Sequence, residues 1–478
     1  MGIHTKQLTR MGYHDHVARS LAVTLVAKYG KHRSDEEIER LLQDLRACPE
    51  RFANDPAWGK LAQHFLPSVA EPVGSPHALN SEPLPYRVYG CEQIEQEALR
   101  QMEMAMRLPV AVAGALMADG HAGYGLPIGG VLATKGAIIP YAVGVDIGCG
   151  MRLSIFDADE RFLKRYRGAV EKALMQHTHF GMDGGLDLAQ DHEVLTHPDF
   201  GSTDLLRRLH GKAVRQLGTS GGGNHFVDFG LITLETRGSH GLTPGTYVAL
   251  LSHSGSRGLG AEVANHYSRL AADRCSLPKQ VQHLAWLDLH SEVGQEYLLS
   301  MNLAAAYASA CHDRIHFNLG RALGLHPLMS VGGHHNLAWE EEHPAVGQVM
   351  VHRKGATPAH RGQWGVIPGS MGTKGYLVSG LGNPDSLCSA SHGAGRRLSR
   401  REARHSISRY ALRQTLKEAG VTLLGGGVDE APEAYKNIDE VMTHQQTLVR
   451  VEGTFVPHLV RMADAEDEMS VKRKDRKR

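Results

Sequence analysis

Hydrophobic residues recur at helical spacing through the first 65 residues of the chain, with polar residues between them. The stretch GYHDHVARSLAVTLVAKYG is followed by Ser34 and Glu37, which fit a capping box that opens the helix EEIERLLQDLRA. Asp55 and Pro56 are typical of another helix start, an N-cap followed by proline at the first helical position. We therefore predict a helical extension at residues 1–65.

The pattern changes after this extension. The stretch LPSVAEPVGSPHALNSEPLPYRV holds five prolines and predicts a linker over residues 66–88. From about 85 to 460, short apolar runs such as GAIIPYAVGVDIGCGMRLSIF are separated by glycine turns, and helical stretches such as DLLRRLHGKAVRQL and NLAAAYASACHDRIHFNLGRAL lie between them. Because no regular alternation of strand and helix is visible, we expect an α+β fold with one large mixed α/β domain at 85–460. A basic, solvated tail should follow at 461–478.

Composition narrows the class of protein. Hydrophobic residues make up 42% of the chain and charged residues 22%, and no apolar stretch reaches the roughly eighteen residues of a membrane helix. The N-terminus lacks the apolar core of a secretion signal, so we expect a cytoplasmic protein with no membrane partner. A net charge of +1 does not by itself indicate a nucleic-acid binder. Six cysteines without a CxxC pair argue against a disulfide framework and a zinc ribbon.

Five short segments pair a glycine-rich loop with a potential metal ligand: GVDIGCGMR, GGGNHFVDFG, LSHSGSRGLG, VGGHHNLAW and SASHGAGRR. A lone histidine or cysteine is usually structural, but five instances of one pattern favour a common site. Asp146 and Cys149 are three residues apart and can meet one ion if the loop turns at Gly148. Three later histidines could complete one or two coordination spheres: His225, His253 and His335. Thiolate and imidazole favour zinc, whereas a carboxylate suits manganese or iron, so the residues alone predict only a divalent transition metal.

The segment SHGAGRRLSR points to phosphate chemistry. The chain has neither a GxxxxGK[ST] loop nor a KxDG motif, which leaves His392 as the candidate nucleophile, since an imidazole can attack phosphorus. Guanidinium groups beside glycine loops are suited to phosphate binding. A helix starting near Arg396 would place Arg396 and Arg400 on one face, four residues apart. The remaining arginines of this helix are expected to be plain surface: Arg397, Arg401 and Arg404.

Nine segments, in order over roughly residues 85–460, resemble the RtcB family of RNA ligases: DGHAGYGLPIGG, AVGVDIGCGMR, GTSGGGNHF, HSGSRGLG, HHN, VHRKGATPA, IPGSMGT, SHGAGRRLSR and APEAYKNIDEV. The resemblance implies an RtcB-type catalytic domain and a GTP- and manganese-dependent enzyme. Such an enzyme joins RNA ending in a 3′-phosphate or 2′,3′-cyclic phosphate to RNA with a 5′-hydroxyl. In that chemistry, His392 would attack the α-phosphate of GTP, GMP would pass to the RNA 3′-phosphate, and the 5′-hydroxyl would displace it.

The resemblance also implies roles for individual residues. Asp146, Cys149 and His225 match one Mn²⁺ site, and Cys149, His253 and His335 match a second, with the thiolate shared. The residues that match the guanine-nucleotide pocket are Asn224, His225, Phe226, Val227, Asp228, His335, Asn336, Pro368, Gly369, Ser370, Met371, His392, Gly393, Ala394, Gly395 and Tyr435. The arginines assigned to RNA phosphates are Arg257, Arg396 and Arg400.

Three positions depart from the family pattern. Asp228 stands where family members commonly have glutamate, and Gly375 stands where they commonly have serine. Met462 stands near the position where they commonly have a C-terminal lysine. The departures favour a divergent paralogue that acts on RNA with broken ends, tRNA or another structured RNA. Two other functions stay open: a metal-dependent phosphoesterase for cyclic RNA ends that uses no nucleotide, and a non-catalytic RNA-end binder. The sequence decides neither the need for a guanylation helper protein nor the oligomeric state.

Overall fold

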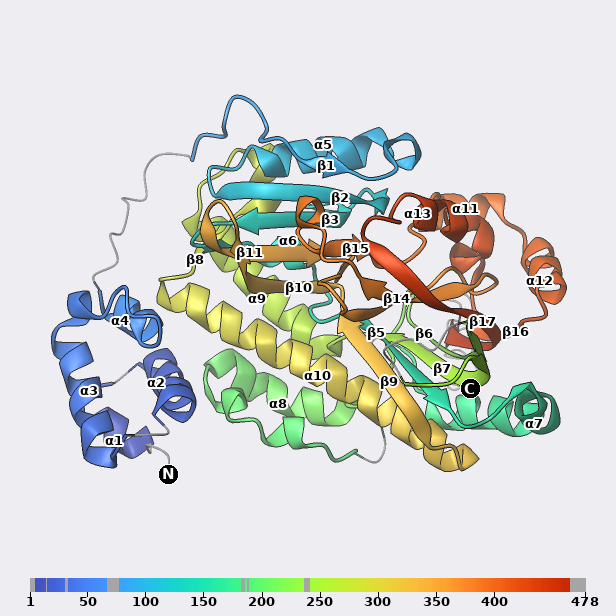
Figure 1. Cartoon of the computed structure of the whole chain (residues 1–478), viewed down its shortest axis with the longest axis horizontal. Helices are drawn as coiled ribbons and strands as arrows, with labels where there is room; N and C mark the ends of the chain where they lie inside the picture. The colour runs from blue at the N-terminus through green and yellow to red at the C-terminus, as the bar shows by residue number, and fades with distance from the viewer. Residues whose placement is uncertain are drawn as a thin grey trace, which may run out of the picture.

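The computed structural model describes residues 5–13, 15–30, 33–66, 77–181, 185–186, 189–235 and 241–464. Figure 1 shows a group of short N-terminal helices beside a larger body in which sheets and helices are mixed. The predicted α+β class, with helices at the N-terminus, is confirmed.

The α-helices are α1 (Thr5–Arg10), α2 (His16–Tyr29), α3 (Asp35–Ala47), α4 (Gly59–Phe65), α5 (Gln96–Met106), α6 (Pro140–Val143), α7 (Glu160–His177), α8 (Asp204–Gln216), α9 (Arg257–Arg274), α10 (Glu292–Leu323), α11 (Arg400–Ser406), α12 (Arg409–Glu418) and α13 (Ile438–Thr443). The strands are β1 (Arg87–Val88), β2 (Ala111–His121), β3 (Ile128–Thr134), β4 (Ala137–Ile138), β5 (Gly150–Phe156), β6 (Phe226–Leu234), β7 (Gly245–Ser254), β8 (Leu287–Asp288), β9 (Pro327–His334), β10 (Asn336–His343), β11 (Gly347–Lys354), β12 (Ala356–Pro358), β13 (Trp364–Ile367), β14 (Gly375–Gly380), β15 (Ser389–Ser391), β16 (Thr422–Gly426) and β17 (Val449–Asp464). Short 3-10 turns lie at Pro49–Arg51, Cys91–Gln93, Glu193–Thr196, Pro198–Gly201, Lys279–Leu284, Pro384–Ser386, Val428–Glu430 and Pro432–Ala434.

The N-terminal helices α1–α4 form a small core of their own around Leu8, Leu42 and Trp58. The predicted capping box opens α3: the Ser34 hydroxyl accepts from the Glu37 amide at 3.2 Å, and the Glu37 carboxylate accepts from the Ser34 amide at 2.7 Å. These helices touch the larger body through an ion pair of Lys60 with Glu340.

The predicted helix start at Asp55 and Pro56 is wrong. The Asp55 carboxylate accepts from the amides of Ala57 and Trp58, at 2.8 and 3.0 Å, and so closes a turn that holds Pro56. Helix α4 begins only at Gly59. Aspartate with proline is equally typical of a turn, because the carboxylate can accept from amides two and three residues later.

The two other segment boundaries also differ in part from the prediction. Residues 67–76 of the expected linker lie outside the described residues, and residues 77–86 form no helix or strand. The basic tail was expected to begin at residue 461, but β17 continues to Asp464. Arg461 belongs to this strand: its guanidinium donates to the Leu424 carbonyl at 2.9 Å, and residues 465–478 lie outside the described part.

Two sheets make up most of the larger body. The first has the order β1-β2-β3-β11-β10, and the second has the order β13-β14-β17-β6-β7-β5-β9, with β16 beside β17. The predicted helices 204–217 and 302–323 are confirmed as α8, which ends at Gln216, and as part of α10, which begins earlier, at Glu292. With α9 they bury a shared apolar core that includes Leu209, Val263 and Tyr307.

The second sheet brings distant parts of the chain to one edge. Gly150, the first residue of β5, pairs with Ser254 on β7 and with His334 on β9. Phe226, the first residue of β6, pairs with His253 on β7. Since adjacent strands lie about 4.8 Å apart, the residues next to these pairs must meet at this edge.

Within the described ranges, the structure holds no helix both long enough and apolar enough to cross a membrane.

Candidate active site

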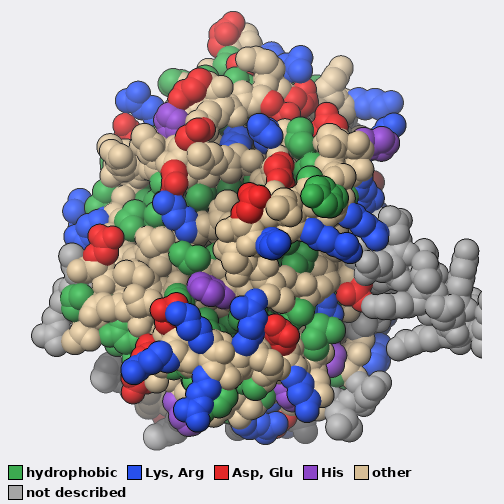
Figure 2. Space-filling model, turned by 90° about the vertical axis from the view of Figure 1, so that its right-hand side faces the viewer, with side chains coloured by type: hydrophobic (Ala, Val, Ile, Leu, Met, Phe, Trp, Pro, Cys, Tyr) green, Lys and Arg blue, Asp and Glu red, His purple; other side chains and the backbone are tan. Residues whose placement is uncertain are grey.

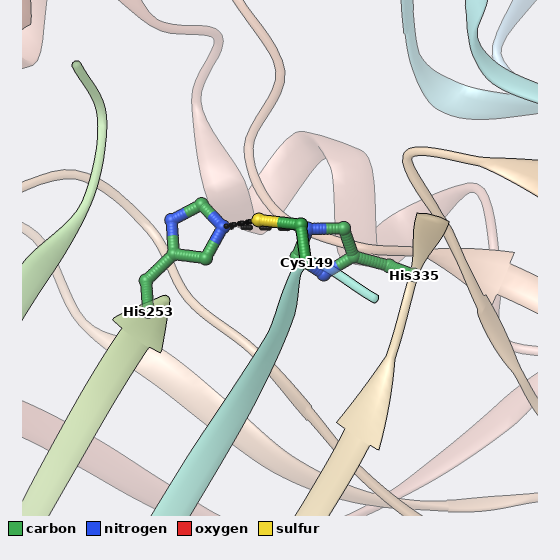
Figure 3. Close-up of side chains that lie close together, drawn as sticks. All are labelled: Cys149, His253 and His335. Atoms are coloured by element: carbon green, nitrogen blue, oxygen red, sulfur yellow. Dashed lines mark hydrogen bonds between the residues drawn. The ribbon is translucent and has the colours of Figure 1, made fainter. Parts of the chain in front are cut away.

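Five potential metal ligands meet at the edge where β5, β6, β7 and β9 come together. The Cys149 thiol lies 3.3 Å from Nε2 of His225 and 3.1 Å from Nε2 of His253. Nε2 of His253 lies 3.3 Å from Nε2 of His335 (Figure 3). A carboxylate oxygen of Asp146 lies 3.0 Å from Nε2 of His225. The ligand atoms form two groups, each within 4.8 Å: Cys149 with His253 and His335, and Asp146 with Cys149 and His225.

The loop before β5 turns at Gly148, as the sequence requires if Asp146 and Cys149 are to meet one ion. Gly148 has φ +72° and donates its amide to the Asn336 carbonyl at 2.7 Å. A Cβ at this position would lie 2.8 Å from Cα of Ala305 on α10. Glycine is therefore needed both for the left-handed backbone and for the close approach of the helix.

Backbone carbonyls orient two of the imidazoles. Nδ1 of His225 lies 2.6 Å from the Ser220 carbonyl, and Nδ1 of His253 lies 3.0 Å from the Asn224 carbonyl. A carbonyl only accepts, so Nδ1 carries a proton in both rings and Nε2 of each ring faces the cluster. This is the usual way in which a protein fixes the tautomer of a metal-binding histidine.

The ionisation of these groups suits a cation. Burial lowers the pKa of His253 and of His335 well below the ordinary value, which keeps both imidazoles neutral. Burial raises the pKa of the Cys149 thiol, and the Asp146 charge raises it further. Burial alone would also raise the pKa of Asp146, but its hydrogen bond to His225 brings that pKa below the usual range. A bound cation would deprotonate the thiol. Together with the neutral imidazoles and the carboxylate, this thiol forms a donor set that fits a divalent metal.

His392 stands beside this cluster, directly after β15. Its ring centroid is 4.7 Å from that of His335. Its Nδ1 lies 2.6 Å from a carboxylate oxygen of Asp119, and the same oxygen accepts the backbone amides of His392 at 3.0 Å and of Gly393 at 3.3 Å. Because Nδ1 is engaged in this way, the lone pair that remains for bond formation is on Nε2.

Sequence reasoning missed Asp119 and the residue that supports it. Asp119 is fully buried at the end of β2, and burial would raise its pKa, but the His392 charge and hydrogen bond lower it below the ordinary value. The Lys436 ammonium donates to the carbonyls of Ala118, at 3.1 Å, and Gly120, at 2.7 Å, and so holds the backbone on both sides of the carboxylate. The signal was present in the motifs DGHAGYGLPIGG and APEAYKN, in which Asp119 and Lys436 had been given no role.

A cavity of about 330 Å³ opens over the cluster and His392. The predicted nucleotide and phosphate residues that line it are Asn224, His225, Phe226, Asp228, His335, Asn336, Pro368, Gly369, Ser370, Met371, His392, Gly393, Ala394, Gly395, Arg396, Arg400 and Tyr435. The side chain of Val227 does not: it points to the other face of β6 and packs in a core with Val170 and Leu174. Alternate residues of a strand face opposite sides, so Val227 cannot share the cavity with Phe226 and Asp228.

The three positions that depart from the family pattern all line this cavity. Asp228 is buried, its Oδ1 has no hydrogen-bond partner among the described residues, and burial raises its pKa well above the usual value. A Cβ at Gly375 would lie 3.0 Å from Cα of Pro368, so the loop here is closed tightly around glycine. Met462 packs with Met371 against helix α12.

The arginines after His392 are arranged differently from the prediction. Helix α11 begins at Arg400, because Ser399 and Glu402 form a capping box, and Arg396 precedes the helix in a bridge to Tyr435. Arg397 and Arg401 are exposed, as predicted. Arg404 is exposed as well, and it also pairs with Asp429 at 3.1 Å.

Arg396 and Arg400 both reach carboxylates. Arg396 lies 3.1 Å from Glu430, and Arg400 contacts Glu430 and lies 3.1 Å from Asp429. Tyr435 donates its hydroxyl to the same Glu430. Two guanidiniums thus lie at the cavity wall, held by acids that sequence reasoning did not identify.

Arg257 lies behind the metal-ligand cluster rather than in the cavity lining. Its Nε donates to the Thr219 hydroxyl at 3.3 Å, and its backbone has φ +56°. Its charge lowers the pKa of Asp146, after the larger effect of His225.

Known proteins resemble this chain over most of its length. A family model described as tRNA-splicing ligase RtcB matches residues 101–462. The RNA-splicing ligase RtcB of Escherichia coli strain K12 is 34% identical over 404 residues, which cover 75% of this chain and 92% of that protein. The RNA-splicing ligase RtcB of Mycobacterium tuberculosis strain H37Rv is 34% identical over 414 residues, covering 71% of this chain and 94% of that protein. The tRNA-splicing ligase RtcB of Nanoarchaeum equitans is 31% identical over 455 residues, covering 78% of this chain and 94% of that protein. With its His392 motif and Asp/Cys/His cluster inside the matched region, this chain belongs to the RtcB family.

Proposed function

We propose that this protein is a GTP- and manganese-dependent RNA ligase that joins 3′-phosphate or 2′,3′-cyclic phosphate ends to 5′-hydroxyl ends through a guanylated His392. One observation carries the proposal: the His392 ring lies between the Asp119 carboxylate and a cluster of metal-type ligands, at the wall of a nucleotide-sized cavity. The substrate class, RNA with broken ends, follows from the RNA-splicing and tRNA-splicing names of the relatives.

The first step uses His392 as the nucleophile. Asp119 holds the proton on Nδ1, so that Nε2 presents its lone pair. Nε2 forms a bond to the α-phosphorus of GTP, the bond from that phosphorus to the bridging oxygen breaks, and pyrophosphate leaves with the electron pair. The Asp119 carboxylate stabilises the positive charge that the ring gains in this step, much as the carboxylate of a catalytic triad stabilises its imidazolium.

In the second and third steps, GMP passes to RNA and then leaves. An oxygen of the RNA 3′-phosphate attacks the phosphorus bound to His392, and the bond between Nε2 and phosphorus breaks. The RNA 5′-hydroxyl then attacks the activated 3′-phosphate, loses its proton, and displaces GMP. A 2′,3′-cyclic phosphate end enters this sequence after water has opened it to the 3′-phosphate.

The guanine base would meet Asp228. This carboxyl group lines the cavity and has a buried oxygen without a hydrogen-bond partner among the described residues, as expected for an acceptor that is satisfied only by a ligand. Guanine offers N–H donors on its base edge, whereas adenine offers no ring N–H there. Asp228 would therefore favour GTP over ATP, with a shorter reach than glutamate.

The metal ions would be held by the two groups that share the Cys149 thiol. When bound, they would neutralise negative charge on the phosphates beside His392. Manganese rather than zinc is taken from the family, since the donor set itself suits either.

A sealing assay tests the proposal. The full chain is incubated with Mn²⁺, GTP, an RNA bearing a 3′-phosphate and an RNA bearing a 5′-hydroxyl, and the joined product is measured. We expect joining with GTP and none with His392→Ala. Joining that is independent of GTP, or no joining by the wild type, would refute the proposal.

A second candidate is a phosphoesterase that opens cyclic RNA ends without a nucleotide. The observation in its favour is the changed cavity wall at Asp228, Gly375 and Met462. It predicts conversion of a 2′,3′-cyclic end to a monophosphate in Mn²⁺ without GTP, and no joined product when GTP is added.

A further inference from the structure

A second hollow, of about 700 Å³, lies between helix α12 and strand β16, next to the active-site cavity. We call it the α12 groove. Its charged lining consists of five cations, Arg167, Arg404, Arg409, Arg413 and Lys417, and a single acid, Asp429. The groove is thus strongly positive in a chain whose net charge is only +1.

Three of the cations form a stripe along α12. Arg409, Arg413 and Lys417 follow one another at intervals of four residues, so they share one face of the helix, about 6 Å apart. All three side chains are exposed. Like charges at this spacing destabilise a helix, and within the described ranges no carboxylate pairs with Arg413 or Lys417. An anion that lies along the stripe would offset this repulsion between the cations.

Part of the groove wall, at the end of β16, is made of glycine. Gly425, Gly426 and Gly427 line the groove, and the first two have φ +85° and +87°. Without side chains, this wall lets the backbone of a long ligand come close to the chain.

The groove continues from the active-site cavity. Arg400 lines the cavity and Arg404 lines the groove, and both lie 3.1 Å from the same Asp429 oxygen. Leu412 and Leu416, on the buried face of α12, pack against Met371, which lines the cavity. Figure 2 views the side of the molecule where α11, α12 and β16 lie in Figure 1, and shows Lys and Arg side chains spread over much of this face.

We propose that the α12 groove holds the phosphodiester backbone of the RNA strand whose reactive end lies at His392. This inference rests on the proposed function and adds a second contact region, several nucleotides away from the reacting phosphate. A phosphodiester chain carries one negative charge per nucleotide, so it places successive charges along the stripe, and binding releases the counterions of the RNA. A narrow positive groove with few aromatic groups binds RNA through its phosphate charges and does not select a base sequence.

The test compares two double variants of the full chain. Arg413→Glu with Lys417→Glu reverses two charges of the stripe, and Arg269→Glu with Lys279→Glu reverses two exposed charges that line neither hollow. Equilibrium binding of a fluorescent single-stranded RNA of roughly a dozen nucleotides is measured at several salt concentrations. A dinucleotide that carries the same reactive end as the long RNA serves as the short ligand.

We expect the groove variant to bind the long RNA on the order of tenfold more weakly, with a salt slope shallower by about 1.4, because two phosphate contacts are lost. The control variant should bind within about twofold of the wild type, and neither variant should change dinucleotide binding. Equal binding of the long RNA by the groove variant and the control variant overturns the proposal. So does an equal loss for the dinucleotide, since the groove would then act at the reactive end.

Two further measurements keep the result interpretable. The thermal midpoint of the groove variant should stay close to that of the wild type, because both substituted side chains are exposed; if it falls, Arg413→Gln with Lys417→Gln replaces the variant and must show the same selective loss. Formation of guanylated wild-type enzyme is measured separately without RNA. Its absence would refute the ligase function, while selective loss of long-RNA binding would still locate the RNA path.

Discussion

A single carboxylate oxygen of Asp119 receives three hydrogen bonds from the His392 segment, from Nδ1 at 2.6 Å, from the His392 amide at 3.0 Å and from the Gly393 amide at 3.3 Å. The carboxylate therefore fixes the ring, its tautomer and the loop that carries it. We infer that Asp119 prepares His392 for attack, although the two residues lie 273 positions apart in the chain.

Asp119→Asn should impair guanylation of His392. An amide keeps the shape, but it lacks the negative charge and can present its NH₂ to Nδ1, which would favour the wrong tautomer. By analogy with the loss of a triad carboxylate, we expect the rate to fall on the order of 10²- to 10⁴-fold. The measurement is the initial rate of label transfer from GTP, with the exposed Asp273→Asn as the matched control. A rate within about twofold of the wild type would show that Asp119 has no such role.

Cys149 should be needed for both metal sites, since its thiol belongs to both ligand groups. Cys149→Ala should lower bound manganese at both, whereas His225→Ala should remove only the group that contains Asp146. After equilibration with Mn²⁺ and gel filtration, elemental analysis should give about two ions for the wild type, about one for His225→Ala and fewer for Cys149→Ala. Exposed Cys48→Ala is the control. Full manganese content in Cys149→Ala would contradict the shared site.

Asp228 should select guanine. Guanine N–H donors would favour the ionised form of Asp228. Asp228→Asn removes this acceptor, and a lost charge-assisted hydrogen bond to a ligand costs about 1.5–3 kcal/mol. We expect GTP to bind roughly 10- to 100-fold more weakly, with ATP affected little, in a titration calorimeter. If both nucleotides weaken equally, the carboxylate acts on the phosphates or the fold rather than on the base.

Lys354 should make stability depend on pH. Burial lowers its pKa to about 7 in the folded chain, below the ordinary value of 10.5, so between these values the unfolded chain binds more protons. The free energy of unfolding should therefore rise with pH in this window, by up to about 1.4 kcal/mol per pH unit from this group.

Lys354→Met removes that contribution. Urea unfolding at pH 7 and pH 9 should show the wild type gaining stability relative to the variant as pH rises. Parallel pH dependence in the two proteins would mean that the Lys354 ammonium stays charged, held by the Tyr124 and Tyr141 carbonyls that it contacts.

The sequence predicted the mixed fold and the five ligand-type residues because both rest on local signals, whereas the division of these ligands into two groups came from the resemblance to the RtcB family. Short glycine-bounded strands and the motifs around Cys149 and His253 can be recognised without knowing what lies beside them. Val227 could also have been separated from Asp228, since alternation along a strand puts neighbours on opposite faces.

Contacts between distant segments could not be predicted in the same way. Asp119 meets His392, and Arg404 meets Asp429, only because the strands and helices that carry them pack together. The end of β17 at Asp464 was missed for a similar reason: Arg461 looks like the start of a basic tail until the Leu424 carbonyl is beside it. Charged residues in such positions give no sign in the sequence of whether they face solvent or a partner.

The most direct test of the central claim is transfer of label from α-labelled GTP to the protein in Mn²⁺, without RNA. The account predicts one acid-labile label on His392, absent from His392→Ala and not formed from ATP. A wild type that takes up no label, or a label that persists in His392→Ala, would contradict it.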